Sequence, residues 1–328
     1  MRRHRLALLS LVLIAASCGA DGGSEVVVSS TETLPVSEAA DVDVPSPDDD
    51  VRRFVGADGV ESEISDTSRV VTLSGDLTEA VFALGLGASV VATDVTTIYP
   101  PEAVTLPVIG IGRFLTAEGV LAENPTLVLG DTQTSPLETI EQIRSAGVPV
   151  VIFDVPTTFE GLYAKTAQIG DVLGVSDQGA ALASDLRSAI ETAMAEAGPL
   201  DPAPGVAFVY SRGPDVMLLF GSGMTTQPII EAAGGRDVGA ESGITGTVSV
   251  TPEAIVAAAP DVIVITQEGL DALGGEAGLL AIPGFAETPA GQAGRILAYP
   301  EGDFLTFGPR IAESLARFIA DLRAEIEG

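Results

Sequence analysis

One local pattern occurs twice in this chain of 328 residues, with Thr251 lying 135 residues after Thr116. The two copies read Thr116-Ala-Glu118 with Pro125 and a Thr-Leu-Val-Leu run, and Thr251-Pro-Glu253 with Pro260 and an Asp-Val-Ile-Val-Ile run. Each copy is typical of a threonine N-cap, a short helix with glutamate in its first turn, a proline that ends the helix, and a buried parallel strand. The chain is therefore predicted to contain two similar α/β lobes.

Two lobes that each expose one glutamate favour a binding protein over a single-site enzyme, because two like surfaces can dock on a two-fold partner. The enzyme class also lacks its usual signatures. The sequence has no Gly-x-Gly-x-x-Gly leading into a helix, no Walker motif, and no mature histidine or cysteine for acid–base, nucleophilic or zinc chemistry. We therefore expect no enzymatic activity and no catalytic residues.

The N-terminus has the pattern of a lipoprotein leader. Residues 1–18 hold three arginines, then an apolar core over Leu6–Ala16 that is too short to span a bilayer. Cys18 is the only cysteine and follows small residues, which favours diacylglycerol attachment over ordinary cleavage and a plain thiol. We expect a lipoprotein signal peptide over 1–18, and a mature protein that is extracytoplasmic and anchored through Cys18 to lipid at the outer face of the cell membrane.

Residues 19–50 contain nine acidic residues and no basic one, which predicts a disordered acidic tether. The formal charge of the whole chain is −30, and removing the three leader arginines takes the mature form to −33. Such acidity excludes nucleic acid as a partner. It favours solubility, as in a saline habitat, over a specific acidic patch.

Residues 51–156 are predicted to form the N-terminal α/β lobe. A hairpin is expected over Phe54–Ile64 around Asp58-Gly59, and a helix from Leu77 with Asp76 and Glu79 at capping-box spacing. Another helix is expected after Ser135-Pro136, with Glu138 at its third position. Strands are predicted at 69–74, 89–93, 126–130 and 149–153. Alternating strands and helices predict a parallel sheet covered on both faces.

Residues 157–200 are predicted to be a helical connector, and its second helix, over Gln178–Ala197, would extend about 30 Å. Residues 201–328 are expected to form the C-terminal lobe. Its predicted elements are strands at 205–210, 216–220, 261–266 and 295–299, a helix ending at Gly234-Gly235, and a closing helix from Pro309. The predicted fold is thus α/β, with two Rossmann-like lobes of parallel sheet joined by a long rigid backbone helix.

Ligands of such sheets bind where strands end and helices begin. We therefore expect the loops at those ends to face one another across a cleft. These loops are Ser74–Asp76, Thr96–Tyr99, Gly110–Phe114, Asp131-Thr132, Ser211–Gly213, Gly246-Thr247, Gln267 and Phe304–Arg310.

Several motifs from about residue 51 onward match one known family in order and spacing. They are Arg69-Val-Val-Thr-Leu-Ser-Gly-Asp-Leu-Thr-Glu79, Tyr99-Pro-Pro, Gly110-Ile-Gly-Arg113 with Leu-Thr-Ala-Glu118-Gly, Ala146-Gly-Val-Pro149, Ser211-Arg-Gly213, Ala233-Gly-Gly235 and Phe307-Gly-Pro-Arg310. Together they resemble the substrate-binding lipoproteins of iron-chelate and vitamin B12 ABC importers, and above all their haemin-binding branch. The resemblance implies a bilobal, monomeric receptor that closes only modestly around its ligand.

The resemblance also implies a partner, an ABC permease with its cytoplasmic ATPase. In the family one glutamate on each lobe meets permease arginines, and the matching positions here are Glu118 and Glu253. A first-turn glutamate that merely complements the helix dipole is the plainer alternative.

The ligand is where the sequence departs from the family pattern. Haemin-binding relatives usually carry tyrosine as the axial iron ligand in a Gly-Tyr-x-Arg loop, and here that tyrosine is replaced by Ile111. Tyr99 is the best substitute as iron ligand if haem is bound, although a tyrosine before two prolines is often a packed structural residue. Arg113, Arg212 and Arg310 would meet anionic ligand groups.

The predicted ligand contacts are Ser74, Asp76, Tyr99, Ile111, Arg113, Phe114, Ser211, Arg212, Phe307 and Arg310. We expect no resident cofactor, since haemin or another iron chelate would be cargo. A corrinoid, a ferric siderophore or a surface lipoprotein without a transport role are the alternatives.

Overall fold

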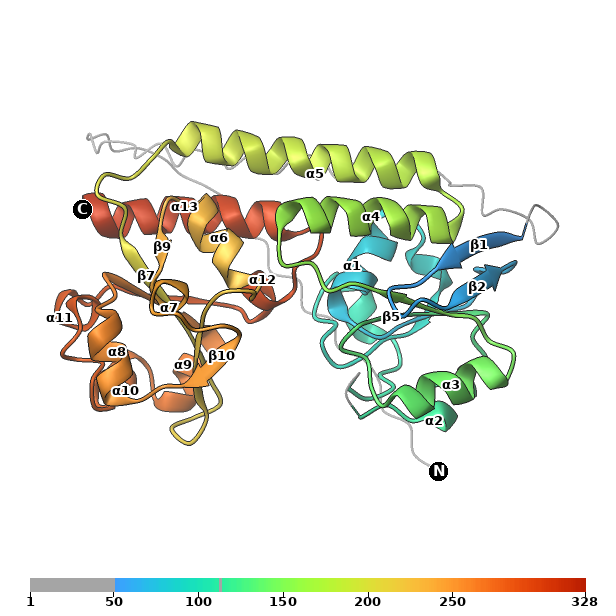
Figure 1. Cartoon of the computed structure of the whole chain (residues 1–328), viewed down its shortest axis with the longest axis horizontal. Coiled ribbons are helices and arrows are strands. Elements are labelled where there is room, and N and C mark those ends of the chain that lie inside the picture. Colours follow the sequence, from blue (N-terminus) through green and yellow to red (C-terminus); the bar gives the residue numbers. More distant parts are fainter. Residues whose placement is uncertain (1–50, 112–113) are drawn as a thin grey trace, which may run out of the picture. The chain divides into compact units, whose positions relative to one another are not determined.

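The computed structural model describes residues 51–111 and 114–328 (Figure 1). The chain divides into two units, Met1–Ala39 and Ala40–Gly328, and every described residue belongs to the second. The predicted leader, its lipidation site Cys18, the acidic tether and Arg113 lie outside the described residues. None of the described helices is both long and apolar enough to cross a membrane.

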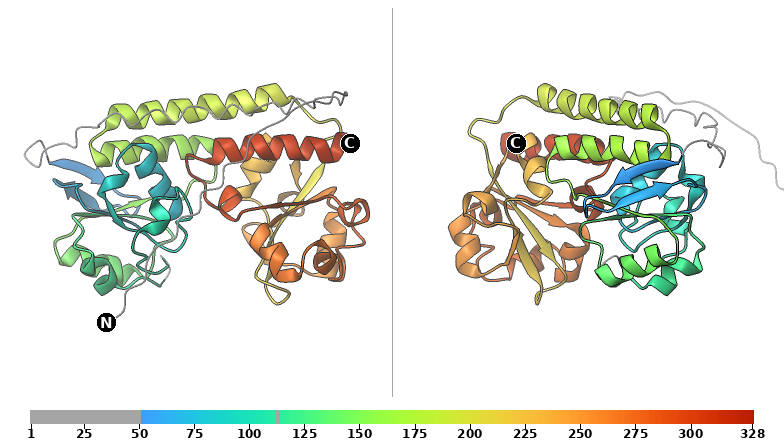
Figure 2. Two further views of the ribbon diagram at one scale, coloured as in Figure 1. Left: turned by 180° about the vertical axis from the view of Figure 1, so that it is seen from behind. Right: turned by 45° about the vertical axis from the view of Figure 1, so that its right-hand side comes forward.

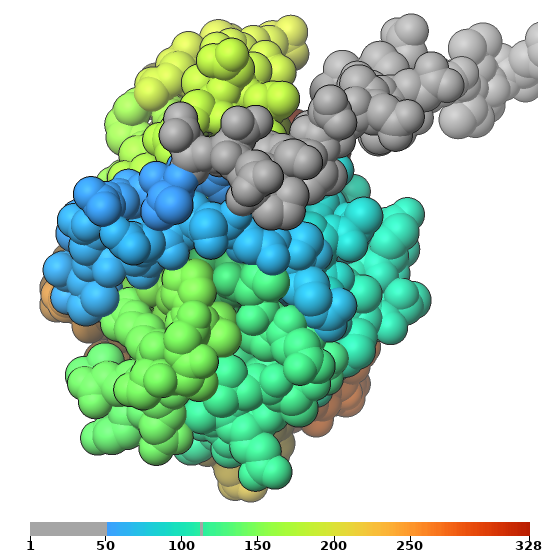
Figure 3. Space-filling model, turned by 90° about the vertical axis from the view of Figure 1, so that its right-hand side faces the viewer, coloured from blue at the N-terminus to red at the C-terminus, as the bar shows by residue number. Residues whose placement is uncertain are grey.

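The described chain opens with the predicted hairpin. Strands β1 (Arg52–Val55) and β2 (Glu61–Ile64) pair antiparallel, and the turn between them uses Gly59 at a φ of +76°. The Ser62 hydroxyl donates to the carbonyl of Val150, 3.1 Å away. The hairpin therefore borders the strand that contains Val150. On the face drawn in Figure 3, the blue residues of the hairpin region lie against green residues of the later chain.

The first sheet is parallel throughout, in the order β4-β3-β5-β6. Its strands are β3 (Val70–Thr72), β4 (Val90–Ala92), β5 (Leu127–Asp131) and β6 (Val150–Phe153). Its helices are α1 (Gly75–Ala83), α2 (Ala117–Ala122) and α3 (Leu137–Ser145), with 3-10 turns η1 (Gly87–Ser89) and η2 (Ala103–Thr105). Val70 packs with Leu77 of α1, whereas Val71 packs with Ile140 of α3. Helices thus cover both faces, as predicted, and we call this sheet with its helices and hairpin the first lobe.

Two helices follow the first sheet, α4 (Phe159–Leu173) and α5 (Ser176–Ala197). The second begins two residues before its predicted start. Gly170 and Gly179 let the two helices approach closely, because a Cβ on Gly170 would lie 2.6 Å from the Cα of Gly179. Helix α5 also contacts the last helix, α13 (Ile311–Glu327), and both views of Figure 2 show α5 running alongside α4 and α13.

The second sheet is mixed, so the prediction of a wholly parallel sheet is wrong here. Its order is β10-β8-β7-β11-β12, with β9 also paired to β7. Strand β8 runs antiparallel to β7 and β10, because the short 212–216 link cannot make the crossover that parallel pairing needs. Its strands are β7 (Gly205–Ser211), β8 (Met217–Phe220), β9 (Arg236–Asp237), β10 (Thr247–Ser249), β11 (Val262–Thr266) and β12 (Ile296–Tyr299).

Helices cover both faces of this sheet as well. They are α6 (Thr226–Ala232), α7 (Val238–Glu241), α8 (Pro252–Ala258), α9 (Gln267–Leu273), α10 (Glu276–Leu280), α11 (Pro289–Ala293) and α12 (Gly302–Leu305), besides α13. Phe208 packs with Phe318 of α13, and its neighbour Val209 packs with Ile255 of α8 on the other face. We call this sheet with its helices the second lobe.

The repeated pattern has the same local structure in both lobes. The Thr116 hydroxyl accepts from the amide of Gly119 at the start of α2, and the Thr251 hydroxyl accepts from the amide of Ala254 at the start of α8. Both helices end before a residue with positive φ that precedes the proline: +50° at Asn124 and +44° at Ala259. These are the only non-glycine residues with positive φ among the described residues. The buried strand that follows, β5 or β11, has a neighbour on each side.

Candidate functional site

An exposed apolar group lies on two neighbouring loops of the first lobe. The amide of Val95 donates to the carbonyl of Gly110, and the amide of Ile109 donates to the carbonyl of Thr93, so the loop after β4 runs beside the segment that leads to Ile111. We call Val95, Ile98, Tyr99, Ile111 and Phe114 the apolar loop group.

The apolar loop group is unusual because its large side chains are accessible. Phe114 is 78% exposed and Tyr99 is 41% exposed. Leaving a side chain of this size in water rather than burying it costs about 1.5–3 kcal/mol. Exposed apolar residues grouped on neighbouring loops in this way are typical of a surface that binds a ligand or a partner.

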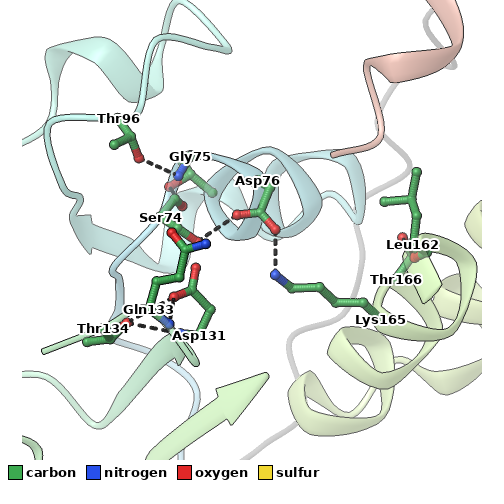
Figure 4. Close-up of polar contacts among 11 residues, drawn as sticks. Ser74, Gly75, Asp76, Thr96, Asp131, Gln133, Thr134, Leu162, Lys165 and Thr166 are labelled. Atoms are coloured by element: carbon green, nitrogen blue, oxygen red, sulfur yellow. Dashed lines mark hydrogen bonds and ion pairs between the residues drawn. The ribbon is translucent and has the colours of Figure 1, made fainter. Parts of the chain in front are cut away.

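Asp76 is bound to the only lysine of the chain. Lys165 of α4 is buried, and its Nζ lies 2.5 Å from the Asp76 Oδ2 of α1, while the Ser74 hydroxyl donates to Oδ1 over 2.7 Å (Figure 4). Burial raises the pKa of Asp76, but the charge and the hydrogen bond of Lys165 together lower it by more than burial raises it, so the net shift is downward. Ser74 and Asp76, both predicted ligand contacts, are thus already bonded to each other.

Asp131 ends β5 beside this pair (Figure 4). Its Oδ1 accepts from the amide of Gln133 over 2.8 Å. The Thr134 hydroxyl accepts from the amide of Asp131 over 3.0 Å and donates to Oδ1 over 3.4 Å. Burial, and then the charge of Asp76, raise the pKa of Asp131. The carboxylates and the lysine therefore form one buried charge cluster at the end of the first sheet.

Glu79 lies one turn after Asp76 and pairs with an arginine of the second lobe, Arg310. Its Oε1 lies 3.3 Å from Arg310 Nε, and its Oε2 has no hydrogen-bond partner among the described residues. Arg310 Nη1 also lies 2.6 Å from Asp303, which pairs in turn with Arg317 of α13. Burial raises the pKa of Glu79 to about 7, outweighing the attraction of Arg310.

The predicted capping box of Asp76 and Glu79 is therefore wrong. Ser74 is the N-cap of α1, and its side chain makes no capping bond. Both carboxylates instead form ion pairs with cations that are distant in sequence: Asp76 with Lys165, and Glu79 with Arg310.

Arg212 and Arg310 were predicted to meet anionic ligand groups, yet both have carboxylate partners within the protein. Arg212 Nη2 lies 2.7 Å from Glu301 Oε2, and its guanidinium lies 4.8 Å from the ring centre of Tyr210. Arg212 is half exposed, so it can still reach a ligand, whereas Arg310 is mostly buried between Glu79 and Asp303.

The structure gives Ser211 and Phe307 structural roles in place of the predicted ligand contacts. Ser211 is fully buried, and its hydroxyl accepts from the amide of Gly213 and donates to that residue's carbonyl. Phe307 is buried in the core, where its ring centre lies 5.5 Å from that of Phe159. Neither side chain is available at the surface, because β7 extends to Ser211 and the loop before α13 turns Phe307 inward.

All four tyrosines lie within the described residues, and Tyr99 is the only exposed one. Tyr163 lies under the Arg187 guanidinium, and the hydroxyl of Tyr299 donates to Asp321 over 2.7 Å. Burial raises the pKa of Tyr299. Tyr99 instead has Arg310 4.9 Å from its ring centre. Of the four tyrosines, Tyr99 is thus the most accessible to a ligand.

The sequence profile of the periplasmic binding protein family matches residues 70–302. This chain belongs to the periplasmic binding protein family. Among solved members, it is 40% identical to the periplasmic heme-binding protein RhuT from Roseiflexus sp. RS-1 in its apo form, with a TM-score of 0.76 over 79% of this chain and 99% of that chain. The heme-binding protein HmuT is 31% identical, with a TM-score of 0.80 over 88% of this chain and 96% of that one.

Another relative is named for a different ligand, cobalamin. The cobalamin-binding protein of Halobacterium salinarum is 29% identical over 328 residues, which is 97% of this chain and 84% of that protein. The family resemblance inferred from the motifs is therefore confirmed. The predicted two-lobed α/β fold of the chain and its predicted role as a binding protein of the type that serves ABC importers are confirmed as well.

This periplasmic binding protein presents its two repeated glutamates to solvent. Glu118 and Glu253 each occupy the first turn of a helix that follows a threonine N-cap, and both are exposed. Neither carboxylate has an ion-pair or hydrogen-bond partner within the described part of the chain. Both carboxylates are therefore accessible and unpaired at matching positions of the two lobes.

Sequence reasoning missed Lys165, Glu79 and Asp303 as residues that organise the site. The one available signal was that Lys165 is the only lysine of a strongly acidic chain. Nothing in the local sequence around Glu79 or Asp303 distinguishes a buried carboxylate from a solvated one. For Glu79 the reason is that its cationic partner, Arg310, lies 231 positions away.

Proposed function

We propose that this protein captures haemin or another iron chelate outside the cytoplasm and delivers it to the permease of an ABC importer. The observation that carries the proposal is the apolar loop group at the strand ends of the first lobe, where a family member is expected to meet its ligand. A flat, largely apolar macrocycle matches exposed aromatic and aliphatic side chains such as Phe114 and Tyr99. The ligand would lie between these loops and those of the second lobe.

Haemin as cargo is supported by heme-binding proteins that are 40% and 31% identical. If haemin binds, Tyr99 would supply the axial phenolate, because it is the only exposed tyrosine and the described residues contain no histidine. Arg113, which lies outside the described residues, and Arg212 would then meet the propionates.

A corrinoid is the second candidate, and a specific observation favours it. Ile111 replaces the usual tyrosine, and the guanidinium groups of Arg212 and Arg310 already pair with carboxylates of the protein. A ligand that needs neither a protein axial ligand nor several free arginines fits this arrangement. The cobalamin-binding relative from Halobacterium salinarum supports the same choice.

Delivery would use Glu118 and Glu253 as contacts for permease arginines. Their exposure and lack of internal partners support this role, and opposite charges of this kind mainly set the rate and orientation of encounter. Attachment of lipid at Cys18 would keep the protein at the outer face of the membrane, next to the permease. We propose a monomer with no catalytic activity and no resident cofactor.

Absorbance titration of the full chain separates the two ligands. Haemin binding through Tyr99 predicts a shifted Soret band that is lost in Tyr99→Phe and kept in the control Tyr210→Phe. A corrinoid receptor predicts saturable binding of cyanocobalamin that Tyr99→Phe leaves intact. Binding of neither compound, nor of a ferric siderophore, would contradict the proposal and favour a surface lipoprotein without a transport role.

A further inference from the structure

Arg310, the residue that precedes α13, touches three groups that belong to different parts of the molecule. It pairs with Glu79 of α1 in the first lobe and with Asp303 of α12 in the second. Its guanidinium carbon also lies 4.9 Å from the ring centre of Tyr99. One buried cation therefore links the two lobes to the most accessible phenol of the apolar loop group.

Two glycines lie in close packing around this contact. A Cβ on Gly308 would lie 3.0 Å from Glu79 Oε2, and a Cβ on Gly302 would lie 2.9 Å from Arg310 Nη2. The same Cβ on Gly302 would come 2.3 Å from Cδ1 of Ile98 in the first lobe. The two lobes thus meet directly beside Arg310.

The charges that face Glu79 come from several elements. Asp76 lies on the same helix and is itself neutralised by Lys165 of α4. Arg310 approaches from the loop before α13, and Asp303 of α12 lies on the far side of that arginine.

Asp303 lies closer to Arg310 than Glu79 does, with 2.6 Å between Nη1 and the Asp303 Oδ1 against 3.3 Å between Nε and the Glu79 Oε1. Its carboxylate binds both Arg310 and Arg317 of α13, so it has two cations where Glu79 has one. The Oε2 atom of Glu79 has no hydrogen-bond partner among the described residues, and its side chain is 2% exposed. A carboxylate that is buried with one unpartnered oxygen is the group in this cluster that most easily takes up a proton.

We propose that Arg310 is a positioning residue: through Glu79 and Asp303 it fixes the spacing of the two lobes and the orientation of the Tyr99 ring, and proton uptake by Glu79 releases this hold. With Glu79 charged, Arg310 is shared between the lobes. With Glu79 neutral, Asp303 alone retains Arg310, and the arginine follows the second lobe.

This switch falls within ordinary pH values, since burial raises the pKa of Glu79 to about 7. The inference concerns the ligand-free protein and does not depend on which ligand the protein takes. Its effect on uptake rests on the proposed function, in which Tyr99 faces the cargo.

The chain contains no tryptophan, so Tyr99→Trp in the full chain introduces a single fluorescent reporter beside Arg310. We expect its emission, measured without ligand, to change in one step as the pH crosses the pKa of Glu79, about 7. Adding Glu79→Gln, which has no proton to exchange, should remove the step. Adding Arg310→Gln should remove it as well, because no cation then moves.

Tyr210→Trp is the matched control, since Tyr210 lies under Arg212, an arginine whose partner is Glu301. Its emission should not depend on Glu79→Gln. The proposal is overturned if the Tyr99→Trp emission is flat across this pH range, or if its step survives either substitution in a protein that circular dichroism shows to be folded. Because no ligand is added, these outcomes are independent of whether the chain binds haemin or a corrinoid.

Discussion

The ammonium group of Lys165 lies 2.5 Å from the carboxylate of Asp76, and both side chains are largely shielded from water. The pair joins α4 to α1 at the end of the first sheet, where the Ser74 hydroxyl completes the coordination of Asp76. Removing one partner of a buried ion pair leaves the other charge without compensation, which is the costly case.

Lys165→Met should therefore lower the free energy of unfolding by about 3–5 kcal/mol, measured by denaturant unfolding. Asp76→Asn in the same chain should restore part of the loss, because no unpaired charge then remains. Arg187→Met is the control, since its ion pair with Glu160 is exposed, and it should cost only a small fraction as much. Equal losses for Lys165→Met and Arg187→Met would contradict the role of the buried pair.

Glu79 should make the stability of the protein depend on pH. Its pKa is raised from 4.5 to about 7 in the folded protein, so the folded state binds more protons than the unfolded chain between these values. The free energy of unfolding should then fall as the pH rises through this window, by about 3 kcal/mol for a shift of this size. Denaturant unfolding at a series of pH values measures the fall.

Glu79→Gln isolates this contribution because it cannot titrate. Burial also raises the pKa of Asp131 and Asp237, which adds falls of the same sign from 3.8 upward. The lowered pKa of Asp76 acts only at acidic pH, where stability is lost as the pH drops below 3.8. The difference between wild type and Glu79→Gln removes these shared terms, and parallel profiles for the two proteins would refute the assignment to Glu79.

The elements of this fold follow from local patterns, whereas the charges of the site do not. The threonine caps at Thr116 and Thr251 and the prolines that close the two helices are read from adjacent residues, because capping and proline geometry act over a few positions. The ion pair of Glu79 with Arg310 joins residues 231 positions apart. Local spacing therefore suggested an N-terminal capping box, whereas in the fold the two carboxylates pair with cations that are distant in sequence.

The antiparallel edge of the second sheet escaped prediction for a related reason. Periodicity identifies β8 as a buried strand but does not state its direction, and the decisive feature is the short link from β7. In the site, the exposed loops of Tyr99 and Phe114 were located from strand ends. Their neighbours Ser211 and Phe307 were assigned to the surface by the same reasoning and are buried.

The apolar loop group should contribute directly to ligand affinity. Phe114→Ala should weaken binding of the cargo about tenfold or more, because a buried side chain of this size contributes about 1.5–3 kcal/mol. Met194→Ala provides a matched control, since Met194 is a large exposed apolar residue on the outer helix α5. Isothermal titration measures both, and equal affinities for the two variants would exclude the group from the binding surface.

Glu118 and Glu253 should be needed for uptake and dispensable for binding. Replacing both by alanine removes the charges that we assign to the permease contact, so cargo uptake by cells should be lost while the affinity of the isolated protein stays unchanged. Glu276→Ala, at another exposed first-turn glutamate, should leave uptake intact. Normal uptake by the Glu118→Ala/Glu253→Ala variant would remove the docking role.

Binding of a tetrapyrrole or iron chelate through these loops underlies every role proposed for this protein. Thermal unfolding of the full chain with haemin, cyanocobalamin or a ferric siderophore tests it most directly. A ligand at a hundredfold excess over its Kd stabilises the folded state by about 2.7 kcal/mol, so we predict a clear rise in Tm with one of the three. An unchanged Tm with all three compounds would mean that the protein takes none of these ligands and is not the proposed receptor.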